Sequence, residues 1–233
     1  MNYKIQPIFV SLLILVQTSC TRPTALTAEL QPRSLQAVNL EENISRRDEL
    51  MLAYTLTSYD AKNKPVGVVN GGWGVETVQK GQQLDLSGGT NPAQSIRLEL
   101  PRNGRMVASL VLIEVDEYAR AQQMLEQVRK IHNIVSVPVS LVLTATEVLT
   151  PLKYVTAGLW ASGVGLKLVD QLDSDDLLGQ SSVEVQEADL RRQKKTRMEV
   201  PAIFTGQHMK DAYEYRLVYD ITLKTVQIRP VRQ

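Results

Sequence analysis

The strongest constraint on the fold is a run of alternating side chains near the end of the chain. The apolar members are Tyr213, Tyr215, Leu217, Tyr219, Ile221 and Leu223, and mostly polar residues separate them. A period of two places successive side chains on opposite faces of an extended chain. The run therefore predicts a β-strand with one buried face.

Three further segments have strand character. Residues 106–115 are almost entirely apolar, which is typical of a strand covered on both faces at the centre of a sandwich or sheet. Residues 50–59 are rich in β-favouring side chains and end in a polar turn closed by Pro65, and residues 96–100 alternate between two turns. These segments predict a mainly β protein built as an antiparallel β-sandwich.

A helical stretch interrupts the strands. Ala121, Leu125 and Val128 recur at helical spacing after residue 118, which indicates an amphipathic helix. The uncharged run between Lys153 and Lys167 is shorter than the ~20 residues that span a bilayer, which favours a packed helical pair over a transmembrane hairpin. We expect one β-sandwich domain over residues 34–233, with an α-helical insertion of about fifty residues at 118–170.

The N-terminus resembles an export signal. Lys4 precedes a nine-residue apolar run at 8–16. As a helix this run is about 14 Å long, which is too short to span a hydrocarbon core of about 30 Å, so it indicates a signal peptide rather than a transmembrane anchor. The following VQTSC resembles the bacterial lipoprotein signal, which implies that residues 1–19 are removed and that Cys20 is acylated. Gln17 departs from the aliphatic residue usual in that signal, and a plain secretory leader is the alternative.

The residues after Cys20 indicate in which membrane the anchored protein is located. Thr21 and Arg22 follow the cysteine, so the aspartate associated with inner-membrane retention is absent there, and we expect the outer membrane with the body on its periplasmic face. Residues 20–33 contain Pro23 and Pro32 and show neither helical nor strand periodicity. This segment is predicted to be a flexible tether.

Aspartates gather after the apolar strand and beyond the insertion. The strings IEVDEY and DSDDLLGQSSVEV resemble the third calcium loop of C2 domains, and RRDELMLAYTL resembles another strand opening of that family. The resemblance implies a C2-like sandwich whose candidate calcium ligands are Asp48, Asp116, Asp173 and Asp176. Tyr118 stands where the second aspartate of the family pattern is expected. A solvated turn or helix cap is the alternative for the aspartate-rich string.

A basic patch follows in RRQKKTR, which contains Arg191, Arg192, Lys194, Lys195 and Arg197. Five cations in seven residues suit anionic lipid headgroups or an acidic envelope protein. Alternatively, the segment is a hydrated loop whose charge is offset by the upstream acids Glu184, Glu187 and Asp189. The whole chain has 26 basic and 25 acidic side chains, a balance that argues against a nucleic-acid partner.

The sequence gives little support for catalysis or a required cofactor. His132 and His208 lack the spacing of a zinc helix, and Cys20 is the only cysteine. We therefore expect a non-enzymatic, lipid-anchored binding or scaffold module that contacts the membrane through its lipid. The alternatives are a calcium-dependent lipid- or protein-binding module and a hydrolase that uses a carboxylate pair such as Asp116 and Asp175.

Overall fold

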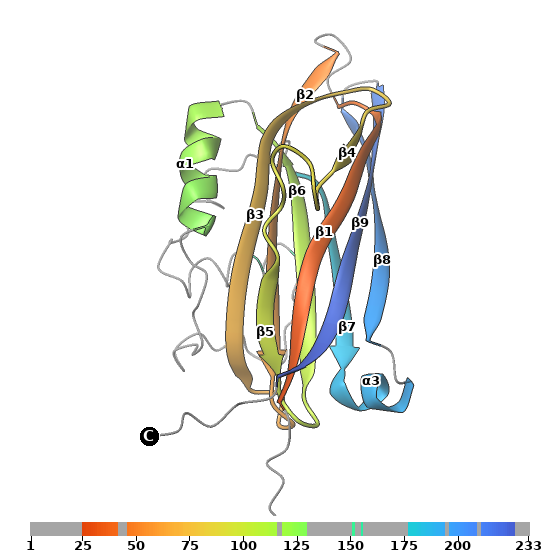
Figure 1. Ribbon diagram of the computed structural model, residues 1–233. Helices are drawn as coiled ribbons and strands as arrows, with labels where there is room; N and C mark the ends of the chain where they lie inside the picture. Colours follow the sequence, from red (N-terminus) through yellow and green to blue (C-terminus); the bar gives the residue numbers. More distant parts are fainter. Residues whose placement is uncertain are drawn as a thin grey trace, which may run out of the picture.

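The computed structural model describes residues 25–41, 46–115, 118–129, 151, 155, 177–193, 196–208 and 211–226. Its elements are β1 (Ala25–Asn39), β2 (Arg47–Tyr59), β3 (Pro65–Gln79), β4 (Gln83–Asp85), β5 (Ile96–Leu100), β6 (Arg105–Glu114), α1 (Tyr118–Arg129), β7 (Leu177–Gln186), α3 (Glu187–Gln193), β8 (Arg197–His208) and β9 (Asp211–Val226). The strands form two antiparallel sheets packed face to face (Figure 1). The prediction of a mainly β, sandwich-type fold is confirmed at this level.

Along the chain, strands of one sheet alternate with strands of the other. Sheet A has the order β4-β1-β9-β8, with β5 also paired to β1, and sheet B has the order β3-β2-β6-β7. The chain therefore leaves sheet A after β1, returns for β4 and β5, and leaves again before it ends in β8 and β9. Residues far apart in the sequence thus become neighbours across the core.

The core lies between the sheets and follows the predicted alternation. In β9, the side chains of Tyr215, Leu217 and Tyr219 are fully buried, whereas Arg216 faces solvent. The central strand β6 is buried on both faces, because Leu110 packs between the sheets and Ile113 packs on the outer face of sheet B. Residues 106–115 are almost entirely apolar because both faces of this central strand are covered by other elements.

Helix α1 covers the outer face of sheet B. Its Ala121 and Leu125 pack with Val111 and Ile113 against the outer face of sheet B, which confirms an amphipathic helix directly after the core strand. Val155 joins the same cluster. The remainder of the predicted insertion at 118–170 lies outside the described residues. No helix in the described part of the chain is long and apolar enough to cross a membrane.

The predicted tether at 20–33 is wrong from residue 25 onward. Residues 25–33 belong to β1, which pairs with β9 along its length and places Ala28 and Leu30 in the core. Pro32 concealed the strand in the sequence, since proline cannot donate a ladder hydrogen bond. The structure accommodates it at a register shift between Pro32 and Ser34.

The register defines two ends of the sandwich. At the basal end, β1 begins beside Leu100, and Arg105 lies opposite both Tyr59 and Gln186. This end therefore gathers the start of β1, the turns 60–64 and 101–104, and α3, all at the bottom of Figure 1. The apical end gathers the start of β2, the end of β6 and the start of β7.

Candidate functional site

Asp48 closes the apical end from inside the core. Its side chain is fully buried, and its Oδ2 accepts hydrogen bonds from the Glu41 N–H at 2.8 Å and from the Tyr215 hydroxyl. Burial, and next the hydrogen bond to Asp48, raises the pKa of Tyr215 well above its usual range, so the phenol keeps the proton it donates. Because Tyr215 lies in sheet A and Asp48 in sheet B, this contact joins the two sheets.

The predicted calcium set is only partly visible. Asp48 lies between the sheets, with the two donors named above, and the other candidates, Asp116, Asp173 and Asp176, lie outside the described residues. The strands that lead to them do meet, since Ile113 of β6 pairs with Leu177 of β7. Within the described ranges, no group of three or more His, Cys, Asp or Glu side chains is placed to hold a metal ion.

No sequence pattern identifies Glu41 and Tyr215 as partners of Asp48. The alternation indicates Tyr215 only as an apolar member of a strand. The two bonded residues are 167 positions apart, so no local motif connects them. A buried tyrosine needs a partner for its hydroxyl, and this was the one available signal.

A second buried acid closes the basal end. Glu187, at the start of α3, is 1% exposed and accepts hydrogen bonds from the Asn103 N–H at 3.2 Å and from the Arg191 guanidinium. Nearby, the Arg105 guanidinium lies 4.1 Å from the centre of the Tyr59 ring and 2.8 Å from Glu184. These contacts hold α3 and the turn 101–104 against the end of the sandwich.

The described members of the basic patch each have an acidic partner. Arg191 pairs with Glu187, Arg192 with Asp189, and Arg197 with Asp220 at 2.8 Å. Two of the upstream acids therefore offset the patch, whereas Glu184 pairs with Arg105 of β6. Lys194 and Lys195 lie outside the described residues. Arg191 and Arg192 lie in the last turn of the short helix α3, and Arg197 begins β8, so none of the three lies in a loop.

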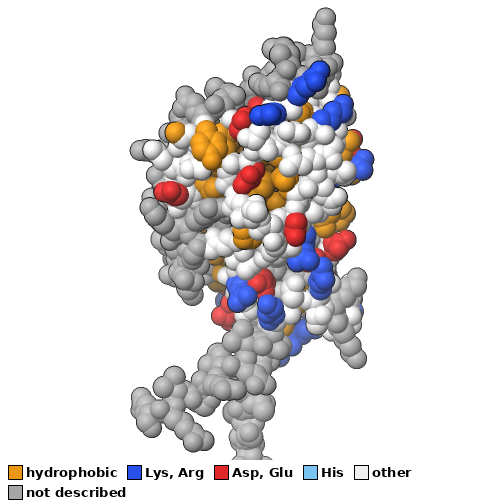
Figure 2. All heavy atoms as spheres, turned by 45° about the horizontal axis from the view of Figure 1, so that its top comes forward, with side chains coloured by type: hydrophobic (Ala, Val, Ile, Leu, Met, Phe, Trp, Pro, Cys, Tyr) orange, Lys and Arg blue, Asp and Glu red, His pale blue; other side chains and the backbone are white. Residues whose placement is uncertain are grey.

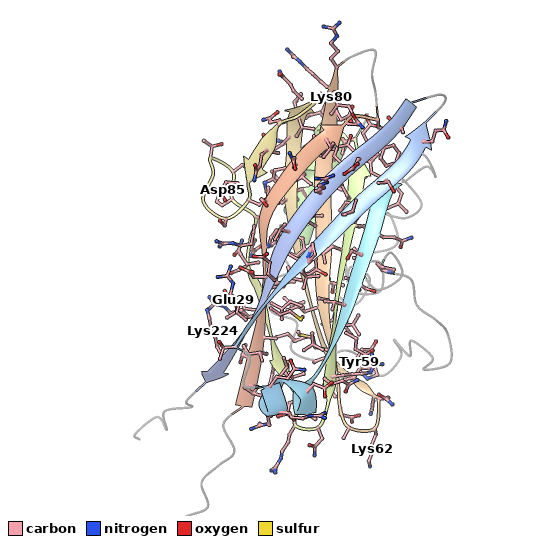
Figure 3. All side chains as sticks on the ribbon, turned by 90° about the vertical axis from the view of Figure 1, so that its right-hand side faces the viewer. Glu29, Tyr59, Lys62, Lys80, Asp85 and Lys224 are labelled. Atoms are coloured by element: carbon pink, nitrogen blue, oxygen red, sulfur yellow. The ribbon has the colours of Figure 1, made fainter. Side chains whose placement is uncertain are left out.

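Three other cations at the basal end are less constrained. Lys62, Lys64 and Arg102 lie in the two turns and are exposed (Figure 3 shows Lys62 at the tip of its turn). In the part of the chain that the structure describes, none of them forms an ion pair with a carboxylate. The turn 60–64 is instead fixed by Asp60, whose Oδ1 accepts the Lys62 and Lys64 N–H groups. These cations were not part of the predicted patch.

The outer face of sheet A carries a network of ion pairs. Glu29 accepts hydrogen bonds from Arg97 at 2.8 Å and from Lys224, whose side chain lies beside it in Figure 3. Burial opposes ionisation of Glu29, but these bonds outweigh it and lower the pKa of the carboxyl below its usual value. Asp220 is likewise buried between Arg33 and Arg197.

Seen partly from the apical end, acidic side chains are scattered over the surface, and several basic side chains lie near one another at the upper edge (Figure 2). The basal end nevertheless differs in its balance of charge. Its segments 60–64, 101–105 and 184–193 contain six basic and four acidic residues, whereas the apical segments 39–41, 46–50, 76–82 and 112–115 contain three basic and five acidic residues. Within these described segments, the basal end has a net positive charge and the apical end a net negative charge.

No protein-family model and no curated protein matches this sequence. Among solved structures, human GIVD cytosolic phospholipase A2 matches with a TM-score of 0.35 and 8% sequence identity. The match covers 87% of this chain but only 17% of the phospholipase chain. A similarity at this level carries no argument about family or activity.

Proposed function

We propose that the chain is a non-enzymatic binding or scaffold module of the bacterial cell envelope, anchored to the outer membrane through acylated Cys20, with a C2-like body. One observation carries the proposal. β1 begins at Ala25, five residues after Cys20, and five extended residues reach at most about 18 Å. A lipid on Cys20 would therefore hold the folded body directly against the bilayer surface.

Metabolic labelling with palmitate tests the anchor. The wild-type chain incorporates the label and fractionates with outer membranes, whereas Cys20→Ala does not incorporate it. Thr24→Ala is the matched control, because it lies between the cysteine and β1 and leaves Cys20 intact. Label retained on Cys20→Ala, or a mature N-terminus at another residue, would refute the lipid anchor.

The binding role is assigned to the apical end. The basal end is held near the membrane in this arrangement, so the apical end faces the periplasm and is accessible to an envelope protein. A photoreactive residue in place of Gln79 at the apical end should crosslink to a partner in intact envelopes, and one in place of Ala61 at the basal end should not. Crosslinking to a protein from position 61 alone would contradict this assignment.

Calcium-dependent binding at the apical end is the second candidate. It is favoured by the pairing that brings the end of β6 beside the start of β7, because Asp116 and Asp176 adjoin those strand ends in the sequence. Calorimetry with calcium on wild type, Asp176→Asn and the basal control Asp60→Asn tests this candidate. We expect heat from wild type and Asp60→Asn only. The absence of heat from wild type would eliminate it.

A further inference from the structure

We propose that the basal end of the sandwich docks onto anionic phospholipid headgroups, so that the body stands on the membrane with its apical end outward. This inference rests on the proposed acylation of Cys20. It adds a second, electrostatic contact to the lipid anchor and assigns an orientation to the body. Stable membrane attachment commonly combines a lipid with a basic surface in this way.

The length of the sandwich excludes the inverted orientation. β3 runs from the basal to the apical end over 15 residues, which corresponds to roughly 45–50 Å. The chain between Cys20 and β1 reaches at most about 18 Å from the basal end. With its lipid inserted in the bilayer, the protein cannot stand with the apical end on the surface.

Charge distinguishes the basal end as the surface in contact with the bilayer. Three of its four acids, Glu184, Glu187 and Asp189, are paired with arginines of the same end. The remaining charges are Asp60 and the cations Lys62, Lys64 and Arg102, which leave a positive excess at the tips of both turns. Each cation near an anionic leaflet strengthens attraction about fivefold, or about 1 kcal/mol.

The same end also carries an exposed apolar side chain. Val66, at the start of β3, is 37% exposed and is one of the few large apolar residues on the described surface. It follows Lys64 by two positions, at the rim of the basal turn. An apolar side chain among cations suits the interface between headgroups and acyl chains, where both kinds of contact are available.

Depth-dependent fluorescence quenching tests the orientation. The lipidated full chain receives one thiol for a fluorophore, by Ala61→Cys at the basal end or by Gln79→Cys at the apical end. Both positions are exposed; Ala61 precedes β3, and Gln79 is its last residue. The proteins are reconstituted into phosphatidylcholine vesicles, with or without phosphatidylglycerol, that contain a headgroup quencher. On vesicles with phosphatidylglycerol, we expect several-fold stronger quenching at position 61 than at position 79. Equal quenching, or stronger quenching at position 79, would overturn the proposal.

A charge comparison tests the cause. Lys62→Gln/Arg102→Gln removes two basal cations, whereas Arg46→Gln/Lys80→Gln removes the same charge from the apical end. Only the basal pair should reduce the quenching at position 61. About 1 M KCl should have the same effect, because the screening length falls to about 3 Å. Equal effects of the two pairs would refute basal docking.

Failure of the anchor is distinguishable from failure of docking. If Cys20 is not acylated, the protein dissociates from the vesicles during flotation in about 1 M KCl, because electrostatic attraction alone is screened. If the protein floats with the vesicles at high salt but the two labels are quenched equally, the anchor stands and the docking inference fails.

Discussion

Asp48 and Glu187 are buried carboxylates at opposite ends of the sandwich, and they make different contacts. Asp48 at the apical end joins sheet B to sheet A through the hydroxyl of Tyr215. Glu187 at the basal end joins a seven-residue helix to a turn, through the Asn103 N–H and the guanidinium of Arg191. The comparison teaches that an acid in a promising sequence pattern can serve the core, while a positive surface can arise elsewhere from turns that meet only in the fold.

The largest effect is expected from Asp48→Ala. The substitution leaves the Glu41 N–H and the Tyr215 hydroxyl without this acceptor, and should lower the free energy of unfolding by about 3 kcal/mol. Tyr215→Phe removes the donor to Asp48 and one of the two acceptors of the Glu41 N–H, whose bond to Asp48 remains, and should cost about 1–2 kcal/mol. Urea unfolding with an unchanged slope measures both. A loss below about 1 kcal/mol for Asp48→Ala would end its role as the link between the sheets.

The corresponding change at the basal end should cost less. Glu187→Ala removes the acceptor for Asn103 and should lower the free energy of unfolding by about 2 kcal/mol. Arg191→Ala should cost under about 1 kcal/mol, because the arginine side chain is 53% exposed and well solvated. Urea unfolding of both variants gives the comparison. A larger loss from Arg191→Ala than from Glu187→Ala would contradict this account of the basal end.

The loss of stability at acidic pH tests the ion pairs of Glu29 on the outer face of sheet A. The pKa of Glu29 is lowered in the folded protein, so its stabilisation is complete above the ordinary carboxyl value and is lost as the pH falls through the folded value. Wild type should therefore lose more stability than Glu29→Gln between about pH 5 and about pH 3, by about 1 kcal/mol. Parallel profiles from thermal unfolding at several pH values would show that the Glu29 contacts contribute nothing.

The smallest stability effect is expected from the basal cations. Lys62→Gln/Arg102→Gln should change the free energy of unfolding by less than about 0.5 kcal/mol, since both side chains are exposed. The difference in quenching between positions 61 and 79 of the lipidated protein should nevertheless decrease. A loss of stability as large as that of Glu187→Ala would show that these cations support the fold rather than a surface contact.

Periodicity predicted the elements whose burial is regular. The alternation in β9, the apolar run of β6 and the helical spacing of α1 were all recognised, because each pattern reflects the local geometry of one element. The start of β1 was missed because Pro32 interrupts the strand signal, and the structure absorbs it in a register shift. The short helix α3 was missed because seven residues give too little helical periodicity.

The candidate site was predicted less well than the fold. The sequence predicted Asp48 as a calcium ligand and the arginines as a basic patch, with Glu187 and Asp189 among the acids that offset it, and Arg191 and Arg192 do pair with those two acids. The partners of Asp48 and Arg197 were not predicted. Arg197 pairs with Asp220 and Asp48 with Tyr215, and both partners lie in β9. Local spacing does not report which charges meet, so pairing across a sheet or a core was beyond the sequence pattern.

The sequence alone determined the mainly β character and the central position of β6, because burial on one or two faces imposes its own period on a strand. Only the tertiary structure decided that Asp48 faces the core, that β1 begins at Ala25 and that the turns holding Lys62 and Arg102 lie at one end. These properties depend on strand register and sheet packing. Both are set by contacts between segments that are distant along the chain.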